Sequence, residues 1–244
     1  MSNKIGVLMW YDHHVKDYGD NCYKINKVYC DKHGYDLIKS SKRFYKPRWT
    51  TDRGELPARN PHWERFPLIL EHINNYDYVI WIDADAFFYN ISPPIEKLIN
   101  KHKKDILFSA DDTDLNPPSV NSGVLILKNT KRVINIIKKW AFSEELKDKY
   151  CGHTILDGFL CPKTNWVEDQ AIVRGFVKDN IDGINEISKL LPYYELQHYN
   201  VGERTALSKL KNKPYIFHLA GRHEYRFIES KKYLDLLRKL GHNI

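Results

Sequence analysis

The sequence predicts an α/β fold in which a mostly parallel, Rossmann-like central sheet is flanked by helices. Three observations support this prediction. Apolar segments of strand length alternate along the chain with longer amphipathic segments, as in βαβ units. One of them, Tyr78–Ile82, consists of β-branched and aromatic residues, as expected for a strand buried on both faces. The 244 residues contain neither a repeat nor a linker, so we expect a single domain spanning residues 1–244.

The composition is that of an ordinary globular protein, with 42% hydrophobic and 28% charged residues. No apolar run is long enough to cross a bilayer, and the first expected strand begins too early to leave room for a signal peptide. We therefore expect a cytoplasmic protein without a transmembrane segment. The net charge of +7 permits anionic ligands. The lysines are scattered over helical faces, however, and no nucleic-acid-binding motif is present, so we expect no nucleic-acid partner.

The four cysteines show no zinc-binding or redox spacing. Cys22 and Cys30 are expected on one helix, two turns apart, where they cannot form a disulfide. Reduced thiols are therefore expected, although a bridge between Cys151 and Cys161 across a loop is an open alternative.

The chain opens with a strand, a helix and a second strand. Lys4–Trp10 is the first expected strand, Tyr11–Asp20 a polar loop, and Tyr18–His33 a helix. Gly34 follows the helix at the position where a left-handed backbone is common. Tyr35–Lys39 is the second strand and completes a βαβ unit. No Gly-x-Gly-x-x-Gly follows the first strand, which argues against a dinucleotide site.

Residues 40–61 are expected to form a surface loop, and a helix through His62–Leu70 leads to the buried strand. That strand ends in Asp83 and Asp85, separated by one residue. Two buried carboxylates are costly unless a cation or hydrogen-bond donors compensate them. Because open α/β sheets bind ligands at the carboxyl ends of their strands, the pair suggests a site for Mg²⁺ or Mn²⁺. The other interpretation is a pair of capping residues that opens the next helix.

The remainder of the chain continues the alternation of helices and strands. A serine followed by prolines marks one helix start, apolar residues at helical spacing mark a second helix, and acids in the first turn favour a third. The expected helices run from Ser92 to about His102, from Thr130 to about Leu146, from Trp166 through Val173, and from about Tyr225 to Leu240. The expected strands are Asp105–Ala110, Asn121–Leu127, Ile184–Leu190 and Pro214–Gly221, while residues 147–164 show little periodicity and residues 193–213 are expected to form a long loop.

Four groups of polar residues lie at the ends of these expected elements. They are Asp83 with Asp85, Asn121 with Ser122, Glu168 with Asp169 and Gln170, and His218 with Gly221. Each group also has a simpler interpretation. The asparagine and serine fit a turn before a strand, the acids fit a helix N-terminus, and the histidine fits a hydrogen-bonded residue of the core.

The order and flanks of these motifs resemble the retaining GT-A glycosyltransferases, most closely glycosyltransferase family 34, the α-galactosyl-, α-mannosyl- and α-xylosyltransferases. The resemblance covers most of the chain. It rests on His33–Asp36, the helix that contains Trp63, Trp81–Ala86, Asn121–Gly123, Glu168–Gln170 and His218–Gly221. It implies a GT-A fold and an enzyme of glycan biosynthesis. Such an enzyme would move a hexose or pentose from a UDP- or GDP-linked sugar to a hydroxyl of a glycan or glycoprotein, with retention of configuration.

The resemblance also implies a role for each motif. Asp83, Asp85 and His218 would hold Mn²⁺, with Mg²⁺ as the alternative ion, and Asp169 and Gln170 would be the catalytic residues. The donor-binding residues would be Met9, Trp10, Tyr11, Arg65, Ala84, Asn121, Ser122, Gly221, Arg222 and His223. The chemistry is consistent with these roles, because a divalent cation neutralises a departing diphosphate and carboxamides suit sugar hydroxyls.

The sequence departs from the family pattern in three places. A lysine is common shortly after the His-x-x-Gly turn, where this chain has Arg222 and His223, and Arg65 stands where lysine is common. Arginine also carries a permanent charge, so these residues can still serve phosphates. Eukaryotic members usually have an N-terminal membrane anchor, and we expect no transmembrane segment here. A bacterial or viral enzyme, or a trimmed chain, is therefore expected.

Other functions fit the sequence less well. Phosphohydrolases of the haloacid dehalogenase type need threonine or valine two positions after the second aspartate, where this chain has Phe87. Sugar nucleotidyltransferases have a glycine-rich, basic N-terminal loop that this chain lacks. A catalytically inactive carbohydrate-binding relative would keep the same fold and cleft, and it is the main alternative function.

Overall fold

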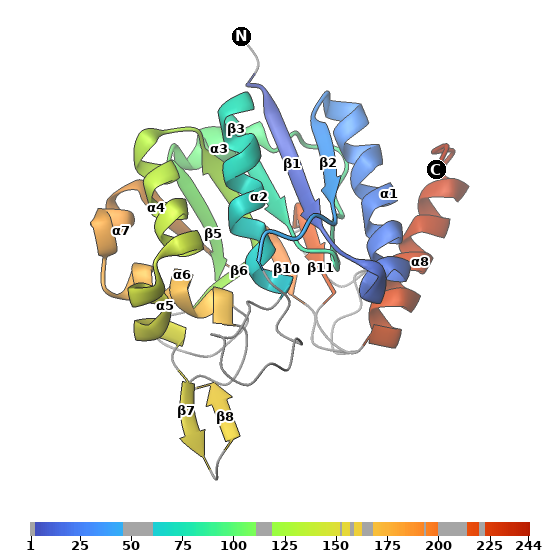
Figure 1. The fold of residues 1–244 in the computed structure, drawn as a ribbon. Helices are drawn as coiled ribbons and strands as arrows, with labels where there is room; N and C mark the ends of the chain where they lie inside the picture. Colours follow the sequence, from blue (N-terminus) through green and yellow to red (C-terminus); the bar gives the residue numbers. More distant parts are fainter. Residues whose placement is uncertain are drawn as a thin grey trace.

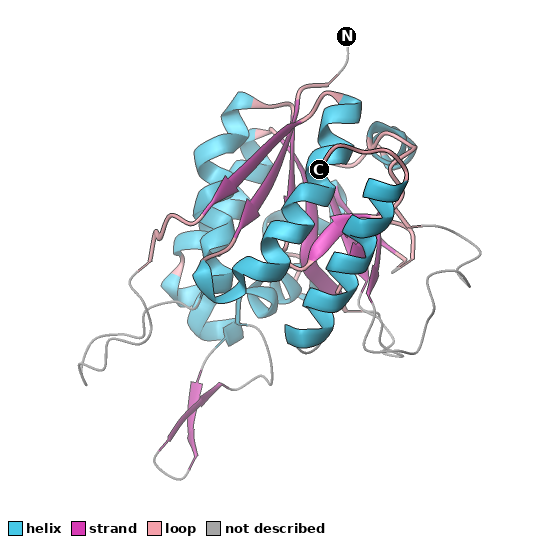
Figure 2. Ribbon diagram, turned by 90° about the vertical axis from the view of Figure 1, so that its right-hand side faces the viewer, coloured by secondary structure: helices cyan, strands magenta, loops and turns pink. Residues whose placement is uncertain are grey.

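A computed structural model of the chain describes residues 3–45, 61–110, 119–151, 153–156, 159–162, 168–192, 194–199, 214–219 and 223–244, with side chains described outside residues 151–168 and residue 199. Its centre is a six-stranded sheet with helices on both faces (Figures 1 and 2). The strand order is β2 (Asp36–Ser40), β1 (Ile5–Trp10), β3 (Tyr78–Ile82), β6 (Val120–Lys128), β5 (Ile106–Ala110) and β9 (Ser188–Leu191). The predicted α/β fold with a flanked central sheet is confirmed.

The direction of β6 decides which residues meet at the edge of the sheet. β1 pairs in parallel with β2 and β3, and β5 pairs in parallel with β9. β6 runs antiparallel to both of its neighbours, β3 and β5. The start of β6 therefore lies beside the end of β3, so residues 121–123 come next to the aspartates that follow β3.

Successive side chains of β1 point to opposite faces of the sheet, so they belong to two separate parts of the core. Val7 and Met9 belong to one apolar cluster, whereas Leu8 and Trp10 belong to the other. The first cluster includes residues of α1 (Lys16–His33), α3 (Glu96–His102) and α8 (His223–Lys239). The second includes residues of α2 (Arg65–His72), α4 (Lys131–Phe142) and α6 (Glu168–Lys178).

A smaller sheet brings the C-terminal part of the chain to the end of β3. It consists of β10 (Gln197–Tyr199), β11 (Ile216–His218) and β4 (Ala86–Phe88). β11 is antiparallel to β4, with His218 opposite Ala86, and the backbone N–H of Leu219 donates to the carbonyl of Asp85 at 2.8 Å. This pairing fixes the histidine beside the aspartates. A third sheet is the hairpin of β7 (His153–Leu156) and β8 (Phe159–Pro162).

Most of the expected elements are present with small shifts at their ends. α1 ends at Gly34, which has the predicted left-handed backbone with φ of 72°. The short 3₁₀ helices η2 (Pro61–Glu64) and η3 (Ile73–Asn75) flank α2. Cys22 and Cys30 are buried free thiols on α1, as predicted, and the side chains of the other two cysteines lie outside the described residues.

Two predictions about helix limits were wrong. The segment Tyr11–Asp20 is not all loop, because it contains η1 (His13–Val15) and the first residues of α1. The Asp12 side chain accepts from the backbone N–H of His14 and starts this turn early. The helix predicted from Thr130 to Leu146 is broken at Ser143, which is extended and caps a second helix, α5 (Glu144–Cys151).

Two further predictions failed on short elements, and a segment without clear periodicity also contains regular structure. The strand predicted at Ile184–Leu190 is one helical turn, α7 (Ile184–Ile187), followed by β9, and α7 itself follows η4 (Ile181–Gly183). Ile184 and Ile187 are three residues apart, a spacing that suits a helical turn as well as an apolar strand. Residues 147–164 contain most of α5 and the β7–β8 hairpin, and the loop predicted at 193–213 contains β10, whose buried residues Gln197 and His198 are polar. Within the described residues, no helix is both long and apolar enough to cross a membrane.

Candidate metal and donor-sugar site

Asp83 and Asp85 lie in the turn that joins β3 to β4, and the predicted alternative of a helix start is wrong because a strand follows them. The backbone N–H of Asp83 donates to the carbonyl of Gly123 at 2.9 Å. The carbonyl of Asp83 accepts from the backbone N–H of Ala86 at 3.0 Å. This turn presents both carboxylates to His218. The His218 Nε2 atom lies 3.1 Å from Asp85 Oδ1 and 3.9 Å from Asp83 Oδ2.

Gly123 leaves the space that His218 occupies. A Cβ atom at this position of β6 would lie 2.2 Å from His218 Cε1 and 3.0 Å from Asp83 Oδ2. No residue with a side chain fits there unless the histidine moves. The glycine of the Asn-Ser-Gly motif therefore allows the imidazole and the carboxylate to approach one another.

Arg65 lies beneath the site and links two of its carboxylates. Its Nη2 atom is 3.3 Å from Asp83 Oδ1 and 2.9 Å from Asp169 Oδ2, and its side chain is only 2% exposed. The Trp81 indole N–H also donates to Asp83 Oδ1, at 2.8 Å. Because this oxygen is held from two sides, the second oxygen of Asp83 is left facing His218.

Asp85 lies between two cations. Its Oδ1 atom faces His218, and its Oδ2 atom lies 2.9 Å from Nε of Arg226, in the first turns of α8. Burial alone would raise the pKa of Asp85, but the charges of His218 and Arg226 outweigh burial and hold it below its usual value. Burial alone would lower the pKa of His218, but Asp85 and then Asp83 outweigh it and raise that pKa.

The predicted sugar-contacting residues are joined by hydrogen bonds between β6 and α6. Gln170 Oε1 accepts from the backbone N–H of Ser122 at 3.0 Å and from its hydroxyl at 3.3 Å. Arg65 Nη1 donates to the carbonyl of Ser122, and the Asn121 side chain accepts from the N–H of Gly123 at 2.9 Å. Asp169, beside Gln170 in the first turn of α6, is completely buried.

The end of β1 is largely occupied by internal contacts. The side chain of Met9 is fully buried, and its sulfur accepts from the Asn26 amide at 3.3 Å, so only its backbone can meet a ligand. The Trp10 indole donates to the carbonyl of Lys42 at 2.7 Å, and the Tyr11 hydroxyl donates to Asp20 at 2.9 Å.

Of the donor-binding residues predicted after His218, the structure describes only His223. His223 is exposed, and its Nε2 atom lies 3.3 Å from Asp17 Oδ1. Gly221 and Arg222 lie outside the described residues. Ala84 is partly buried between the two aspartates. Arg226 was missed, although a cation in the first turns of the helix after the His-x-x-Gly turn is a signal that could have indicated it.

The chain is similar to known glycosyltransferases in sequence and in fold. Residues 2–118 match the sequence model of the galactosyl transferase GMA12/MNN10 family. The fold is similar to a glycosyltransferase involved in the glycosylation of the major capsid of PBCV-1, at 16% identity over 93% of this chain and 99% of that one, with a TM-score of 0.64. No curated protein matches the chain.

Two further solved structures share the fold at 12% identity. The galactosyltransferase LgtC, solved with donor and acceptor sugar analogues, matches over 98% of this chain and 97% of its own, with a TM-score of 0.53. The bifunctional glycosyltransferase WbbM matches over 94% of this chain and 50% of its own, with a TM-score of 0.54. The chain therefore has the GT-A fold of these glycosyltransferases.

A second group of ligand-type side chains lies elsewhere on this protein. The ligand atoms of Asp12, His13 and His14 lie within 4.8 Å of one another, as do those of Asp83, Asp85 and His218, and these are the two such groups among the described residues. Both histidines of the first group are exposed. Spacing alone therefore does not distinguish the two groups.

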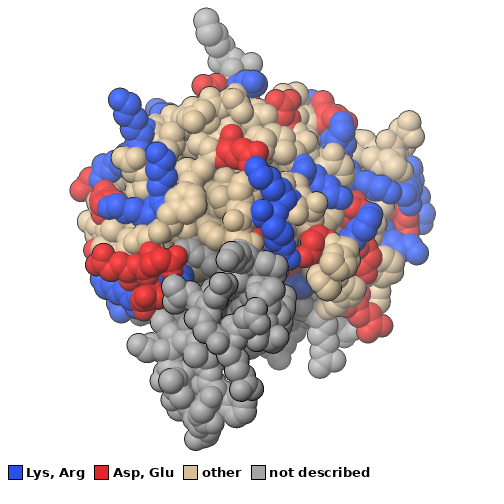
Figure 3. Space-filling model, in the orientation of Figure 1, with Lys and Arg blue, Asp and Glu red and all other residues tan. Residues whose placement is uncertain are grey.

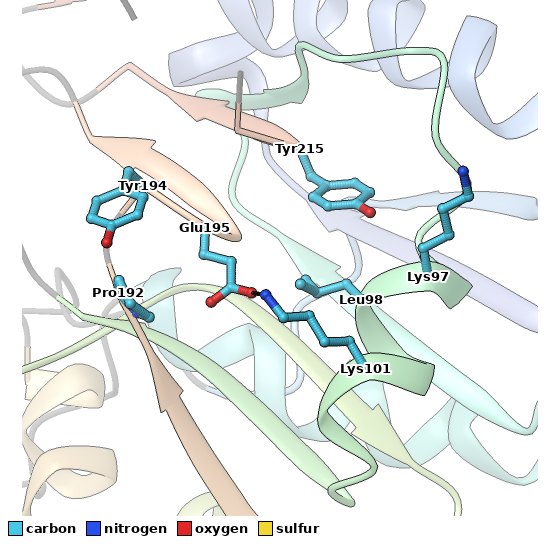
Figure 4. A pocket seen from close by; sticks show the side chains of 7 residues that line it. All are labelled: Lys97, Leu98, Lys101, Pro192, Tyr194, Glu195 and Tyr215. Atoms are coloured by element: carbon cyan, nitrogen blue, oxygen red, sulfur yellow. Dashed lines mark hydrogen bonds and ion pairs between the residues drawn. The ribbon is translucent and has the colours of Figure 1, made fainter. Parts of the chain in front are cut away.

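Other surface features of the protein are separate from the group formed by Asp83, Asp85 and His218. A hollow of about 450 Å³ is lined by residues of α3, the segment after β9 and Tyr215, with Lys101 paired to Glu195 at 2.6 Å (Figure 4). None of its seven lining residues belongs to the site above. On the face shown in Figure 3, lysines and arginines are interleaved with acids over the described surface, as expected from their scatter in the sequence.

Proposed function

We propose that this protein is a glycosyltransferase that moves a sugar from a UDP- or GDP-linked donor to a glycan hydroxyl, with retention of configuration. A divalent cation would be held by Asp83, Asp85 and His218. One observation carries the proposal: Asp83 and Asp85 after β3 and His218 at the end of β11 bring their ligand atoms within 4.8 Å of one another, next to the Arg65–Asp169 pair. The family resemblance supports retention of configuration.

The three side chains carry ligand atoms suited to a divalent cation, and neighbouring residues orient them. Two carboxylate oxygens and an imidazole nitrogen suit Mn²⁺, and two carboxylates alone would suit Mg²⁺. The other oxygen of Asp83 is oriented by the Trp81 indole, as is usual for metal ligands. The space beside Gly123 is filled by His218 itself, so the imidazole is positioned by backbone shape and not only by attraction.

A cation bound there would neutralise the charge that develops on the departing nucleoside diphosphate. The chain's own residues would do the rest. Asn121 and Gln170 carry carboxamides that suit sugar hydroxyls. Asp169 is buried and paired with Arg65 at 2.9 Å. This pairing favours an orienting or charge-stabilising role for Asp169 over attack on the sugar.

The test is Mn²⁺-dependent release of nucleoside diphosphate from a panel of nucleotide sugars, with and without glycan acceptors. We expect Asp85→Ala to lose both transfer and slow donor hydrolysis, because one of the three proposed metal ligands is removed. The matched control is Asp235→Ala, which removes an exposed acid of α8 paired only with Arg238 within the described residues. Unchanged rates in Asp85→Ala would refute the metal role. Binding of Mn²⁺ and nucleotide without turnover of any donor would instead support an inactive carbohydrate-binding relative.

A further inference from the structure

Arg226 occupies a position that the sequence did not assign to any role. Its Nε atom lies 2.9 Å from Asp85 Oδ2 and also donates to the carbonyl of Leu219 at 3.1 Å. The side chain is 29% exposed, whereas that of Arg65, the other arginine of the site, is 2% exposed. Arg65 is enclosed by protein, but Arg226 keeps one side open to a ligand.

The guanidinium is held in place independently of Asp85. It lies 5.5 Å from the centre of the Tyr18 ring, and Nη1 donates to the Tyr18 hydroxyl at 3.4 Å. Tyr18 is a buried residue of α1, which packs against α8. A cation bound by Asp85 would therefore share this carboxylate with an arginine that remains nearby.

A fixed positive charge beside a metal has opposite effects on two ligands. It competes for Asp85 and repels a divalent cation bound alone, which weakens that binding. It attracts a diphosphate that arrives on the metal, and the planar fork of arginine suits phosphate oxygens. Both effects increase the dependence of one ligand on the other.

We propose that Arg226 couples metal binding to donor binding: it weakens the divalent cation bound alone and strengthens the nucleoside diphosphate bound with it. The inference rests on the proposed metal site and adds a coupling residue to it. It predicts that the enzyme binds Mn²⁺ weakly until the nucleotide is present. By linkage, the nucleotide must then bind weakly until Mn²⁺ is present.

The experiment measures Mn²⁺ binding by electron paramagnetic resonance of the free ion, with wild type and Arg226→Gln, in the absence and presence of UDP or GDP. In Arg226→Gln we expect Mn²⁺ alone to bind several-fold more tightly and the nucleotide with Mn²⁺ about tenfold more weakly, which is within the usual range of coupling between sites. Arg226→Lys keeps the charge without the fork. We expect this variant to keep weak Mn²⁺ binding and to lose part of the nucleotide affinity.

The control is Arg238→Gln, the same substitution on the same helix at an exposed pair with Asp235, and it should change neither affinity. Circular dichroism would verify that each variant is folded. A parallel fall in both affinities would show that Arg226 only supports Asp85, and unchanged affinities would show no role at all; either result overturns the proposal. If wild type bound no Mn²⁺, the proposed metal site itself would fail.

Discussion

The two groups of ligand-type side chains differ in how the chain assembles them. Asp83 and Asp85 follow β3, whereas His218 ends β11, more than a hundred residues later. Asp12, His13 and His14 are consecutive residues before and within the single turn η1. The first group exists only when the sheets have formed, while the second follows from local chain geometry. Only the first group is held rigidly by the fold.

The surroundings of the two groups differ as well. Asp83 is oriented by Trp81 and Arg65, and the space beside Gly123 positions His218. Both oxygens of Asp12 are already engaged, one with the N–H of His14 at 3.0 Å and the other with Arg43 at 2.6 Å. Binding sites need such oriented support around the ligands, and close spacing does not provide it. Three substitutions can break or sharpen this comparison.

The largest effect is expected from Gly123→Ala. The new methyl group would collide with the His218 ring and press on Asp83, so the imidazole must leave its place. Displacement of a ligand by about 1 Å can cost about a hundredfold in activity, and we expect a loss of at least that size in Mn²⁺ affinity and turnover. The measurement is Mn²⁺ titration together with donor hydrolysis.

Gly34→Ala is the control for general destabilisation by an added methyl group. Gly34 has a positive φ, and a Cβ atom added to it would have no other atom within 4 Å. Its replacement by alanine therefore strains the backbone without a collision with any ligand residue. It should lower the melting temperature and leave Mn²⁺ affinity unchanged. Wild-type affinity in Gly123→Ala would mean that His218 is not a required ligand.

A smaller effect is expected from Trp81→Phe. This substitution keeps an aromatic ring in the core and removes the N–H that donates to Asp83 Oδ1 at 2.8 Å. Loss of one orienting contact should weaken Mn²⁺ binding by about tenfold, the lower end for residues that support a metal ligand. Trp140→Phe, in the same apolar cluster, is the matched control and should change stability alone. Equal Mn²⁺ affinities of the two variants would argue against the orienting role.

The elements that were predicted correctly have strong local signals. Tyr78–Ile82 is a continuous apolar strand, and α1 ends at a glycine that adopts the expected backbone. α7 and β10 were missed because elements of four and three residues do not complete a recognisable period. The break at Ser143 was missed because apolar residues continue at helical spacing on both sides of it.

The site residues were also predictable only where the sequence around them carries a local signal. The two aspartates were indicated by their own strand, but His218 was assigned only through the family resemblance. Arg226 reaches Asp85 because α8 packs on α1. A cation early in the helix after the His-x-x-Gly turn is the signal in the sequence, but it does not report that packing. Arg65 was expected to contact the donor, whereas the structure buries it between two carboxylates, a pairing that depends on where α6 begins.

The smallest effect is expected at the exposed group, from the double substitution His13→Ala/His14→Ala. Within the described part of the chain, the two imidazoles contact mainly each other, with ring centres 4.0 Å apart, and the carboxylate next to them is occupied. Surface substitutions of this kind change free energies little, so Mn²⁺ affinity should stay within about twofold of wild type. The titration should also give the same number of bound ions per chain for both proteins. A lower number in the variant would mean that three neighbouring side chains in one turn can bind a metal without support from the fold, and the distinction between the two groups would then be wrong.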